Sequence, residues 1–224
     1  MTIDIKNNIY AISAPSGVGK TTLIHKLIDN NPDKFMLSIS HTSRAPRGQE
    51  KDGLDYHFVT EDFFTNHKEA MLETATVHGN IYGTSMYEIE RIKSLGRCPL
   101  LEIDVQGVAQ VIKKIPVITI FVLPPTLETM WLRLEGRATD DLPTRWKRLC
   151  NAHGEIAQAG IYSHFLINDK LDLAYNKLAS FILEGKDTLL LNKEEGLKYC
   201  KNLMDEFNNA PWIKKLRLEI NGRI

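Results

Sequence analysis

Short apolar runs alternate with amphipathic stretches along this chain, a rhythm that predicts an α/β fold with a mostly parallel core sheet flanked by helices. The runs expected to form core strands are Ile9–Ser13, Arg97 to Asp104, Val117–Leu123 and Phe165–Ile167. One apolar face at helical spacing predicts a helix soon after the first strand. Its members are Leu23, Ile24, Leu27 and Ile28. Further helices are expected at Tyr87–Leu95, Leu127–Glu135, Arg145–Ala159 and Leu171–Leu183.

Three segments depart from this rhythm. The stretch from Ser38 to Gly83 is polar and strand-rich, which suggests a small subdomain inserted beside the main sheet. Gly136 to Thr144 is charged and punctuated by Gly and Pro, as suits a mobile lid. After about Gly185 the α/β pattern stops. One more amphipathic helix is then marked by Leu197, Cys200, Leu203, Met204 and Phe207.

The last segment, Trp212–Ile224, is a mixed basic tail. Its apolar residues Leu216, Leu218 and Ile220 alternate with polar ones, which fits an added strand or an oligomer interface. Its basic side chains fit a solvated end or a subunit contact better than an anionic partner. The role of residues 185–224 stays open at this stage.

The overall charge narrows the function only a little. Among 224 residues, 28 are Lys or Arg and 28 are Asp or Glu, so the formal net charge is zero. This balance argues against a dedicated nucleic-acid protein or a protein of anionic membranes, and no run of apolar residues is long enough to span a membrane. Three widely spaced cysteines, Cys98, Cys150 and Cys200, are expected to be free thiols. The expected location is the cytoplasm.

The strongest chemical signal is the segment Ala14-Pro-Ser-Gly-Val-Gly-Lys-Thr21, which has the spacing of an ATP phosphate-binding loop. Glycines let successive backbone N–H groups turn inward around phosphate, and the start of the following helix adds partial positive charge. Lys20 is expected at the β- and γ-phosphates, and the Thr21 hydroxyl is expected to ligate Mg²⁺. The residues predicted to bind ATP are Ala14, Pro15, Ser16, Gly17, Val18, Gly19, Lys20, Thr21 and Thr22.

A second phosphate site is indicated by Arg44 and Arg47, which stand three residues apart in a hydroxyl-rich segment. Arginine forks bind phosphate in bidentate fashion, so this pair suits an acceptor phosphate, although a solvated basic turn is the alternative. Tyr56 and Tyr82 would add phenolic donors.

Guanine offers two N–H donors and one carbonyl acceptor, and the chain has matching groups. Glu73 and Asp104 are acceptors in apolar surroundings, and Ser40 can donate. Glu102 and Asp104 are two apart on an expected strand, so both would point to one face. From the residues alone, Asp104 is either a Mg²⁺ ligand or a guanine contact.

Six sequence blocks in order resemble the guanylate kinase family and cover about residues 8–184. They read SAPSGVGKTTLIHKL, SISHTSRAPRGQEKDGLDYHF, MLETATVHGNIYGTS, LLEIDVQGVAQV, FVLPPTLETMWLRLEGRATD and INDKLD. The resemblance implies the nucleoside-monophosphate-kinase fold, with a GMP-binding region at about 38–84 and a lid at about 136–148. It leaves 185–224 as a C-terminal extension.

The resemblance also implies residue roles. The guanine contacts would be Ser40, Glu73, Thr84 and Asp104. The GMP phosphate contacts would be Arg44, Arg47, Tyr56 and Tyr82. Arg137 and Arg148 match lid arginines that close on the transferring phosphoryl group, and Asn168 matches a position near the adenine of ATP. Thr84, Thr74, Ala138 and Lys170 depart from the residues usual in the family, and none of these changes removes a group expected to touch phosphate.

The predicted activity is transfer of a phosphoryl group from ATP to GMP, giving ADP and GDP within purine nucleotide metabolism. The GMP phosphate oxygen would attack in line, with Lys20, Arg44, Arg137, Arg148 and Mg²⁺ spreading the charge. Two alternatives remain: a kinase of the same fold acting on a phosphorylated sugar, and an inactive scaffold that binds protein partners. ATP and GMP are the expected partners of a monomer or homo-oligomer.

Overall fold

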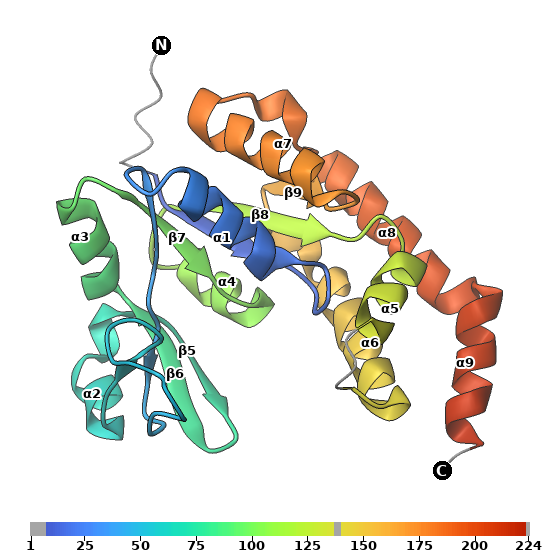
Figure 1. The fold of residues 1–224 in the computed structure, drawn as a ribbon, viewed down its shortest axis with the longest axis horizontal. Coiled ribbons are helices and arrows are strands. Elements are labelled where there is room, and N and C mark those ends of the chain that lie inside the picture. Colours follow the sequence, from blue (N-terminus) through green and yellow to red (C-terminus); the bar gives the residue numbers. More distant parts are fainter. Residues whose placement is uncertain (1–7, 137–139, 223–224) are drawn as a thin grey trace. The chain divides into compact units, whose positions relative to one another are not determined.

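The computed structural model describes residues 8–136 and 140–222, which form an α/β fold with a five-stranded sheet flanked by helices (Figure 1). The strand order is β2-β7-β1-β8-β9, and the pairs β2–β7 and β8–β9 are parallel. The bounds are β1 Tyr10–Ser13, β2 Phe35–Leu37, β7 Cys98–Glu102, β8 Ile118–Leu123 and β9 His164–Ile167. Parallel neighbours need crossover connections, which is why helices separate these strands in sequence. The expected fold class is confirmed.

The helices predicted from the apolar periodicity are present, and the described part of the chain adds three that were not predicted, at Glu61–Asn66, Val105–Val111 and Pro211–Asn221. Their bounds are α1 Lys20–Asn30, α2 Glu61–Asn66, α3 Met86–Ser94, α4 Val105–Val111, α5 Leu127–Glu135, α6 Leu142–Ala157, α7 Leu171–Glu184, α8 Lys193–Asn209 and α9 Pro211–Asn221. Short 3₁₀ turns lie at Lys68–Ala70, Ala159–Ile161 and Asp187–Leu189. Helix α6 begins three residues before the predicted Arg145, because the Asp141 carboxylate accepts a hydrogen bond from the Thr144 N–H at 2.9 Å and caps the helix. No described helix is both long enough and apolar enough to cross a membrane.

The strand-rich pattern after Ser38 is confirmed by a second sheet with the order β4-β3-β6-β5. Its strands are β3 His41–Thr42, β4 His57–Phe58, β5 Met71–Val77 and β6 Asn80–Ser85. Strands β5 and β6 form an antiparallel hairpin whose turn residues His78 and Gly79 both have positive φ, 50° and 80°. Such a turn matches the right-handed twist of a hairpin.

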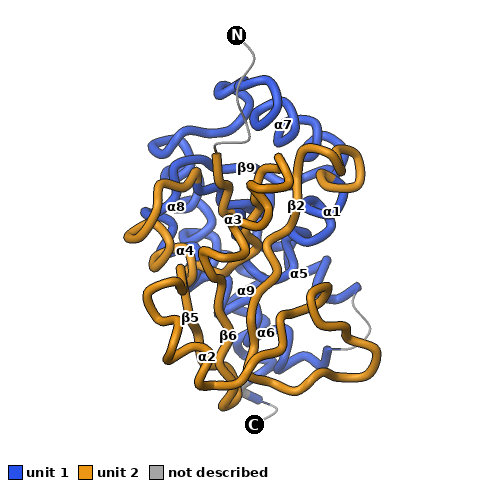
Figure 2. The backbone as a smooth tube through the Cα atoms, turned by 90° about the vertical axis from the view of Figure 1, so that its left-hand side faces the viewer, with its two compact units in different colours: residues 1, 12–26, 119–224 blue, residues 2–11, 27–118 orange. Residues whose placement is uncertain are grey.

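Two compact units divide the chain (Figure 2). The first contains Ile12–Lys26 and everything from Thr119 onward, and the second contains Leu27–Ile118 together with the start of β1. The division therefore runs through strands β1 and β8.

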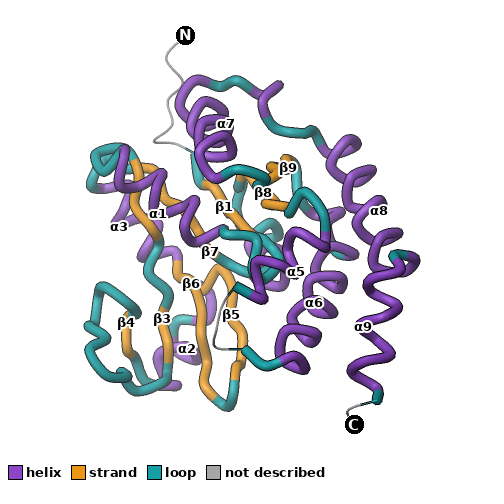
Figure 3. Tube along the Cα trace, turned by 45° about the vertical axis from the view of Figure 1, so that its right-hand side comes forward, coloured by secondary structure: helices purple, strands orange, loops and turns teal. Residues whose placement is uncertain are grey.

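The C-terminal segment is helical, and the strand considered for residues 216–220 is wrong. Figure 3 shows α8 and α9 following one another beside α5 and α6. On α9 the buried residues are Ile213, Leu216 and Ile220, a helical spacing, whereas Leu218 is 74% exposed. Pro211 at the first helical turn fixes where α9 starts.

Candidate active site

The phosphate-binding loop connects the end of β1 to the start of α1, which is the strand–loop–helix context that the motif requires. Gly17 and Gly19 have φ of 91° and 96°, values that residues with a side chain rarely adopt. A Cβ atom on Gly17 would also lie 2.7 Å from Leu134 Cδ2. Lys20 is the first residue of α1, and Thr21 follows in the exposed first turn. The loop thus depends on glycine for both its backbone shape and its close packing.

Asn168 holds the loop from the far end of β9. Its Nδ2 donates to the Val18 carbonyl at 2.8 Å, and the side chain is buried. Its Oδ1 is buried and accepts no hydrogen bond within the described part of the chain. A cavity of about 430 Å³ opens beside these groups. It is lined by Gly17, Val18, Gly19, Thr22, Arg133, Gly136, Asn168 and Leu171.

Arg133 is a residue of this site that the sequence reasoning missed. Its guanidinium donates to the Asn168 carbonyl at 2.9 Å and to the Asp169 carbonyl at 2.7 Å. A longer contact of 3.5 Å reaches the Val18 carbonyl. The sequence offered only an arginine in the last turn of α5 as a signal, since its carbonyl partners lie directly after β9 and in the phosphate-binding loop.

Arg148 reaches the phosphate loop from α6. Its Nη1 donates to Ser16 Oγ at 3.1 Å, and its Nε pairs with Asp140 Oδ2 at 3.0 Å. The structure therefore brings this predicted arginine to Ser16 of the phosphate-binding loop. Arg137 and Ala138 lie outside the described residues.

In the second unit, three of the four predicted guanine contacts lie close together: Glu73, Thr84 and Asp104. Glu73 is 7% exposed and accepts a hydrogen bond from Thr84 Oγ1 at 2.8 Å. A Cβ atom on Gly107 would lie 3.5 Å from both Glu73 Cγ and Asp104 Oδ1, so these two acidic side chains flank the same glycine. Burial raises the pKa of Glu73, the Thr84 hydrogen bond opposes that rise, and the nearby Asp104 charge adds to it. An N–H donor of a ligand would stabilise the charged form of Glu73.

The expectation that Asp104 lies on a strand with Glu102 is wrong. Strand β7 ends at Glu102, and Asp104 is the N-cap of α4, where its Oδ1 accepts from the Gly107 N–H at 2.8 Å. Capping satisfies a backbone donor that would otherwise have no partner in the helix. The side chain remains exposed.

The predicted phosphate contacts form a second cluster in this unit. Arg44 donates from Nε to the Tyr82 hydroxyl at 3.1 Å and lies over the Tyr56 ring at 5.4 Å. Its two terminal nitrogens also bind the Glu50 carboxylate, at 2.9 and 3.0 Å. Glu50, which the sequence reasoning missed, further accepts from the Arg47 N–H at 2.7 Å. The Arg44 hydrogen bond holds the pKa of Glu50 below its ordinary value.

This pairing changes how Arg44 can meet a phosphate. A guanidinium has five N–H donors. In Arg44 one serves Tyr82, two serve Glu50 and one donates to the Ala45 carbonyl at 2.8 Å. The fork expected for bidentate phosphate binding is thus used by Glu50, and Arg44 has its charge and one remaining donor to offer. The Arg47 side chain is exposed.

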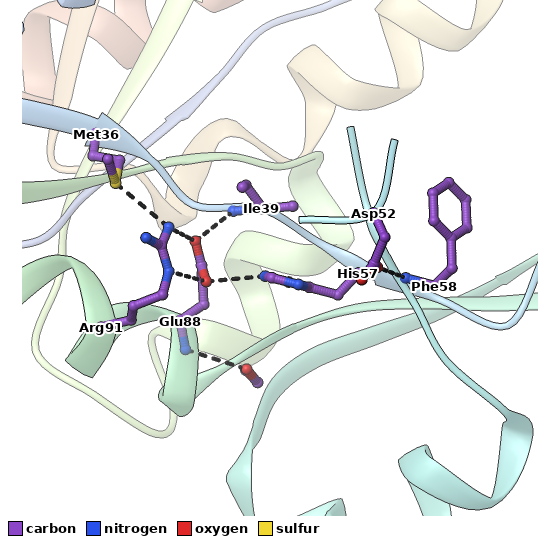
Figure 4. Close-up of polar contacts among 8 residues, drawn as sticks. Met36, Ile39, Asp52, His57, Phe58, Glu88 and Arg91 are labelled. Carbon is purple, nitrogen blue, oxygen red and sulfur yellow. Dashed lines mark hydrogen bonds and ion pairs between the residues drawn. The ribbon is translucent and has the colours of Figure 1, made fainter. Parts of the chain in front are cut away.

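Figure 4 shows a further buried network around Glu88, which is 2% exposed in the first turn of α3. Its carboxylate accepts from the Ile39 N–H at 3.1 Å, from His57 Nε2 at 3.1 Å and from two nitrogens of Arg91 at 2.6 and 2.9 Å. Burial alone would raise the pKa of Glu88, but these hydrogen bonds together hold it below its ordinary value. Ile39 precedes Ser40 and His57 follows Tyr56, so Glu88 fixes the backbone beside two predicted GMP contacts.

Comparisons with known proteins agree with this geometry. The guanylate kinase family model matches residues 6–185. The chain is 48% identical over 177 residues to the guanylate kinase of Nitrosospira multiformis, covering 78% of this chain and 84% of that one. It is 38% identical over 188 residues to the guanylate kinase of Schizosaccharomyces pombe, covering 81% and 93%. The chain belongs to the guanylate kinase family.

A solved structure of the same family also matches. The crystal structure of guanylate kinase from Anaplasma phagocytophilum aligns with a TM-score of 0.58 and 29% identity, over 86% of this chain and 94% of that chain. The resemblance drawn from the six sequence blocks is confirmed, and these relatives favour neither the sugar-phosphate kinase nor the inactive scaffold. Helices α8 and α9 lie beyond the last residue that the family model matches.

Proposed function

We propose that this chain transfers the γ-phosphoryl group of ATP to GMP, giving ADP and GDP in purine nucleotide metabolism. As a guanylate kinase it is an ATP:GMP phosphotransferase. The observation that carries the choice of acceptor is the buried Glu73 carboxylate, hydrogen-bonded to Thr84 with Asp104 across Gly107. Two acceptors with this spacing suit the N1–H and exocyclic amino group of guanine, and Ser40 would serve its carbonyl oxygen.

For phosphoryl transfer the protein has to position the two nucleotides and stabilise the negative charge of the phosphates. An oxygen of the GMP phosphate attacks the γ-phosphorus, the bond to the bridging oxygen of ADP breaks, and ADP leaves with the electron pair. Lys20 and Arg148 would hold the transferred group from the ATP side, with Asn168 near the adenine. Arg44, Arg47, Tyr56 and Tyr82 would hold the GMP phosphate. Arg137 is assigned to the transferring phosphoryl group from the family resemblance alone.

The donor set also fits a magnesium ion bound with ATP. Thr21 offers an exposed hydroxyl in the first turn of α1, beside the loop that would hold the phosphates. The described residues contain no cluster of three or more His, Cys, Asp or Glu side chains that could hold a metal. Phosphate oxygens and water molecules would supply other ligands, as is usual for Mg²⁺ bound with a nucleotide. Mg²⁺ held in this way would neutralise phosphate charge.

Several wider assignments belong to the same proposal. The catalytic domain would span 8–184, with GMP bound by 38–84, a lid at 136–148 and an extension from 185. A cytoplasmic location is supported by Cys98, Cys150 and Cys200, which are free thiols. The substrates are the proposed partners, and the chain would act as a monomer or homo-oligomer.

Selectivity for guanine provides the test. In the Glu73→Gln variant, one acceptor for the guanine donors becomes an amide. We expect GMP binding to weaken about 100-fold or more while ATP binding is unchanged, because a site built for a substrate donor discriminates strongly when the pairing is lost. Titration calorimetry with each nucleotide measures both effects. Glu69→Gln, an exposed change just before β5, is the matched control. Equal weakening for ATP and GMP would refute the guanine assignment.

A further inference from the structure

The C-terminal extension, α8 and α9, contacts both helices that border residues 137–139. At the start of α5, the Glu206 carboxylate accepts from the Leu127 N–H at 2.9 Å and from the Glu128 N–H at 3.0 Å. The Tyr199 hydroxyl donates to the Pro125 carbonyl at 2.6 Å, just before the same helix. A carboxylate at a helix N-terminus satisfies orphan donors and complements the helix dipole. The extension is therefore bonded to the core by polar contacts in addition to apolar packing.

The contact with α6 is an aromatic stack centred on Phe207. The Phe207 ring lies 4.1 Å from the His153 ring and 6.0 Å from the Trp146 ring, measured between centroids, and is nearly parallel to both. Arg217 of α9 lies over the Phe207 and Trp146 rings at 4.9 and 5.9 Å. It also donates to the Phe207 carbonyl at 3.1 Å. His153 is seven residues after Trp146, so the extension packs against one face of α6 over two helical turns.

The other face of α6 carries Arg148. Residues two apart on a helix point about 200° from one another, so Trp146 and Arg148 project to nearly opposite sides. Arg148 contacts Ser16 of the phosphate loop at 3.1 Å. Helix α6 is thus held between the extension and the loop, and its rotation and depth determine where the Arg148 guanidinium lies.

We propose that the extension is a positioning element for phosphoryl transfer, in which Phe207 and Arg217 hold α6 through Trp146 and so place Arg148 at the phosphate loop. This inference rests on the role proposed for Arg148 above. A guanidinium that acts on the transferring group matters most in the transition state, and small displacements there are costly. Losing the stack therefore lowers kcat while the KM for GMP stays the same.

The variant that tests this is Phe207→Leu in the full chain, compared with Phe181→Leu. Phe181, on α7, is similarly buried, and its ring also lies beside a histidine, His164, with the two centroids 4.7 Å apart. Coupled measurement of ADP release gives kcat and both KM values, and thermal melts give stability. We expect kcat to fall about tenfold for Phe207→Leu. Phe181→Leu should lower the melting temperature comparably and leave kcat unchanged. An equal fall in kcat for the two variants would overturn the proposal.

A double-mutant cycle with Arg148→Ala separates the positioning role of Phe207 from the role of Arg148 itself. If Phe207 acts through Arg148, adding Phe207→Leu to Arg148→Ala produces no further fall in kcat. A full additive fall overturns the positioning role and leaves the proposed function intact. Normal kcat for Arg148→Ala alone would instead overturn the role proposed for Arg148.

A milder variant covers the case in which Phe207→Leu does not fold. Arg217→Gln removes the cation over the stack without opening a core cavity, and should show the same selective fall in kcat. Lys214→Gln, at an exposed position of the same helix, is its control. Unchanged kcat for Arg217→Gln together with a non-folding Phe207→Leu would count against the proposal.

Discussion

Acid should destabilise this protein through His41, one residue after the proposed guanine contact Ser40. The His41 side chain is 7% exposed, and its ring stacks on Phe63 at 4.9 Å and lies tilted against the His57 ring at 4.7 Å, measured between centroids. Its Nδ1 is buried and has no hydrogen-bond partner within the described residues. The pKa of His41 is lowered from 6.5 to about 4, mainly by burial and also by the nearby His57, while Glu88 opposes the shift.

The sign and size of the effect follow from the two protonation states. Above pH 6.5 His41 is neutral in both the folded and unfolded chain, so it adds no pH dependence. As the pH falls from 6.5 toward 4, the unfolded chain takes up a proton that the folded chain does not, and stability decreases. The loss is about 2 kcal/mol by pH 5 and about 3 kcal/mol by pH 4.

Urea unfolding of the wild type and of His41→Phe at pH 7.5 and pH 5 measures this loss. Phenylalanine keeps a ring against Phe63 and cannot titrate, while every other acid-sensitive group is present in both proteins. We expect the wild type to lose about 2 kcal/mol more than the variant over this interval. If the two proteins lose the same free energy of unfolding, His41 is not the acid-sensitive group.

Three further variants test the network in Figure 4, the packing of α8 and a glycine inside α6. Glu88→Gln should raise the KM for GMP about tenfold with little change in the KM for ATP, since Glu88 fixes the backbone beside Ser40 and Tyr56. Steady-state kinetics measures both KM values, and a rise in both would contradict this role. Glu90→Gln, at an exposed position of the same helix, is the control. Gly196→Ala should destabilise the chain by more than about 2 kcal/mol, because its Cβ would lie 2.0 Å from the Phe165 ring. Gly154→Ala, in α6 with no atom within 4 Å of its Cβ, should instead stabilise by about 0.5–1 kcal/mol in the same thermal melts.

Local pattern was sufficient for the phosphate loop and for most of the sheet and helices. The loop between β1 and α1 is specified by residues adjacent in sequence, because glycine conformation and a helix N-terminus are both local properties. The core strands β1, β7, β8 and β9 and the helices α5 and α7 likewise follow from apolar spacing, which reports the buried face directly, whereas the short edge strand β2 was not predicted. Pairing of Glu73 with Thr84 needed the β5–β6 register, which a single sequence does not reveal.

Local pattern failed at the C-terminus for a physical reason. Leu216, Leu218 and Ile220 alternate as a strand would, yet α9 buries Ile213, Leu216 and Ile220 at helical spacing and leaves Leu218 exposed. Short apolar patterns fit either periodicity, and the packing of α9 against its neighbours decided between them.

What the sequence by itself determined is therefore the chemistry: a loop for ATP phosphates, two arginines and a set of acceptors that resemble a guanylate kinase. Tertiary structure decided which partners those groups have. In the folded chain Arg44 is hydrogen-bonded to Glu50, Glu88 accepts hydrogen bonds from Ile39 and His57, and Asp104 caps a helix. Most of these contacts depend on which atoms approach within about 3 Å after folding, so charge and spacing along the chain predict the groups but not their hydrogen bonds.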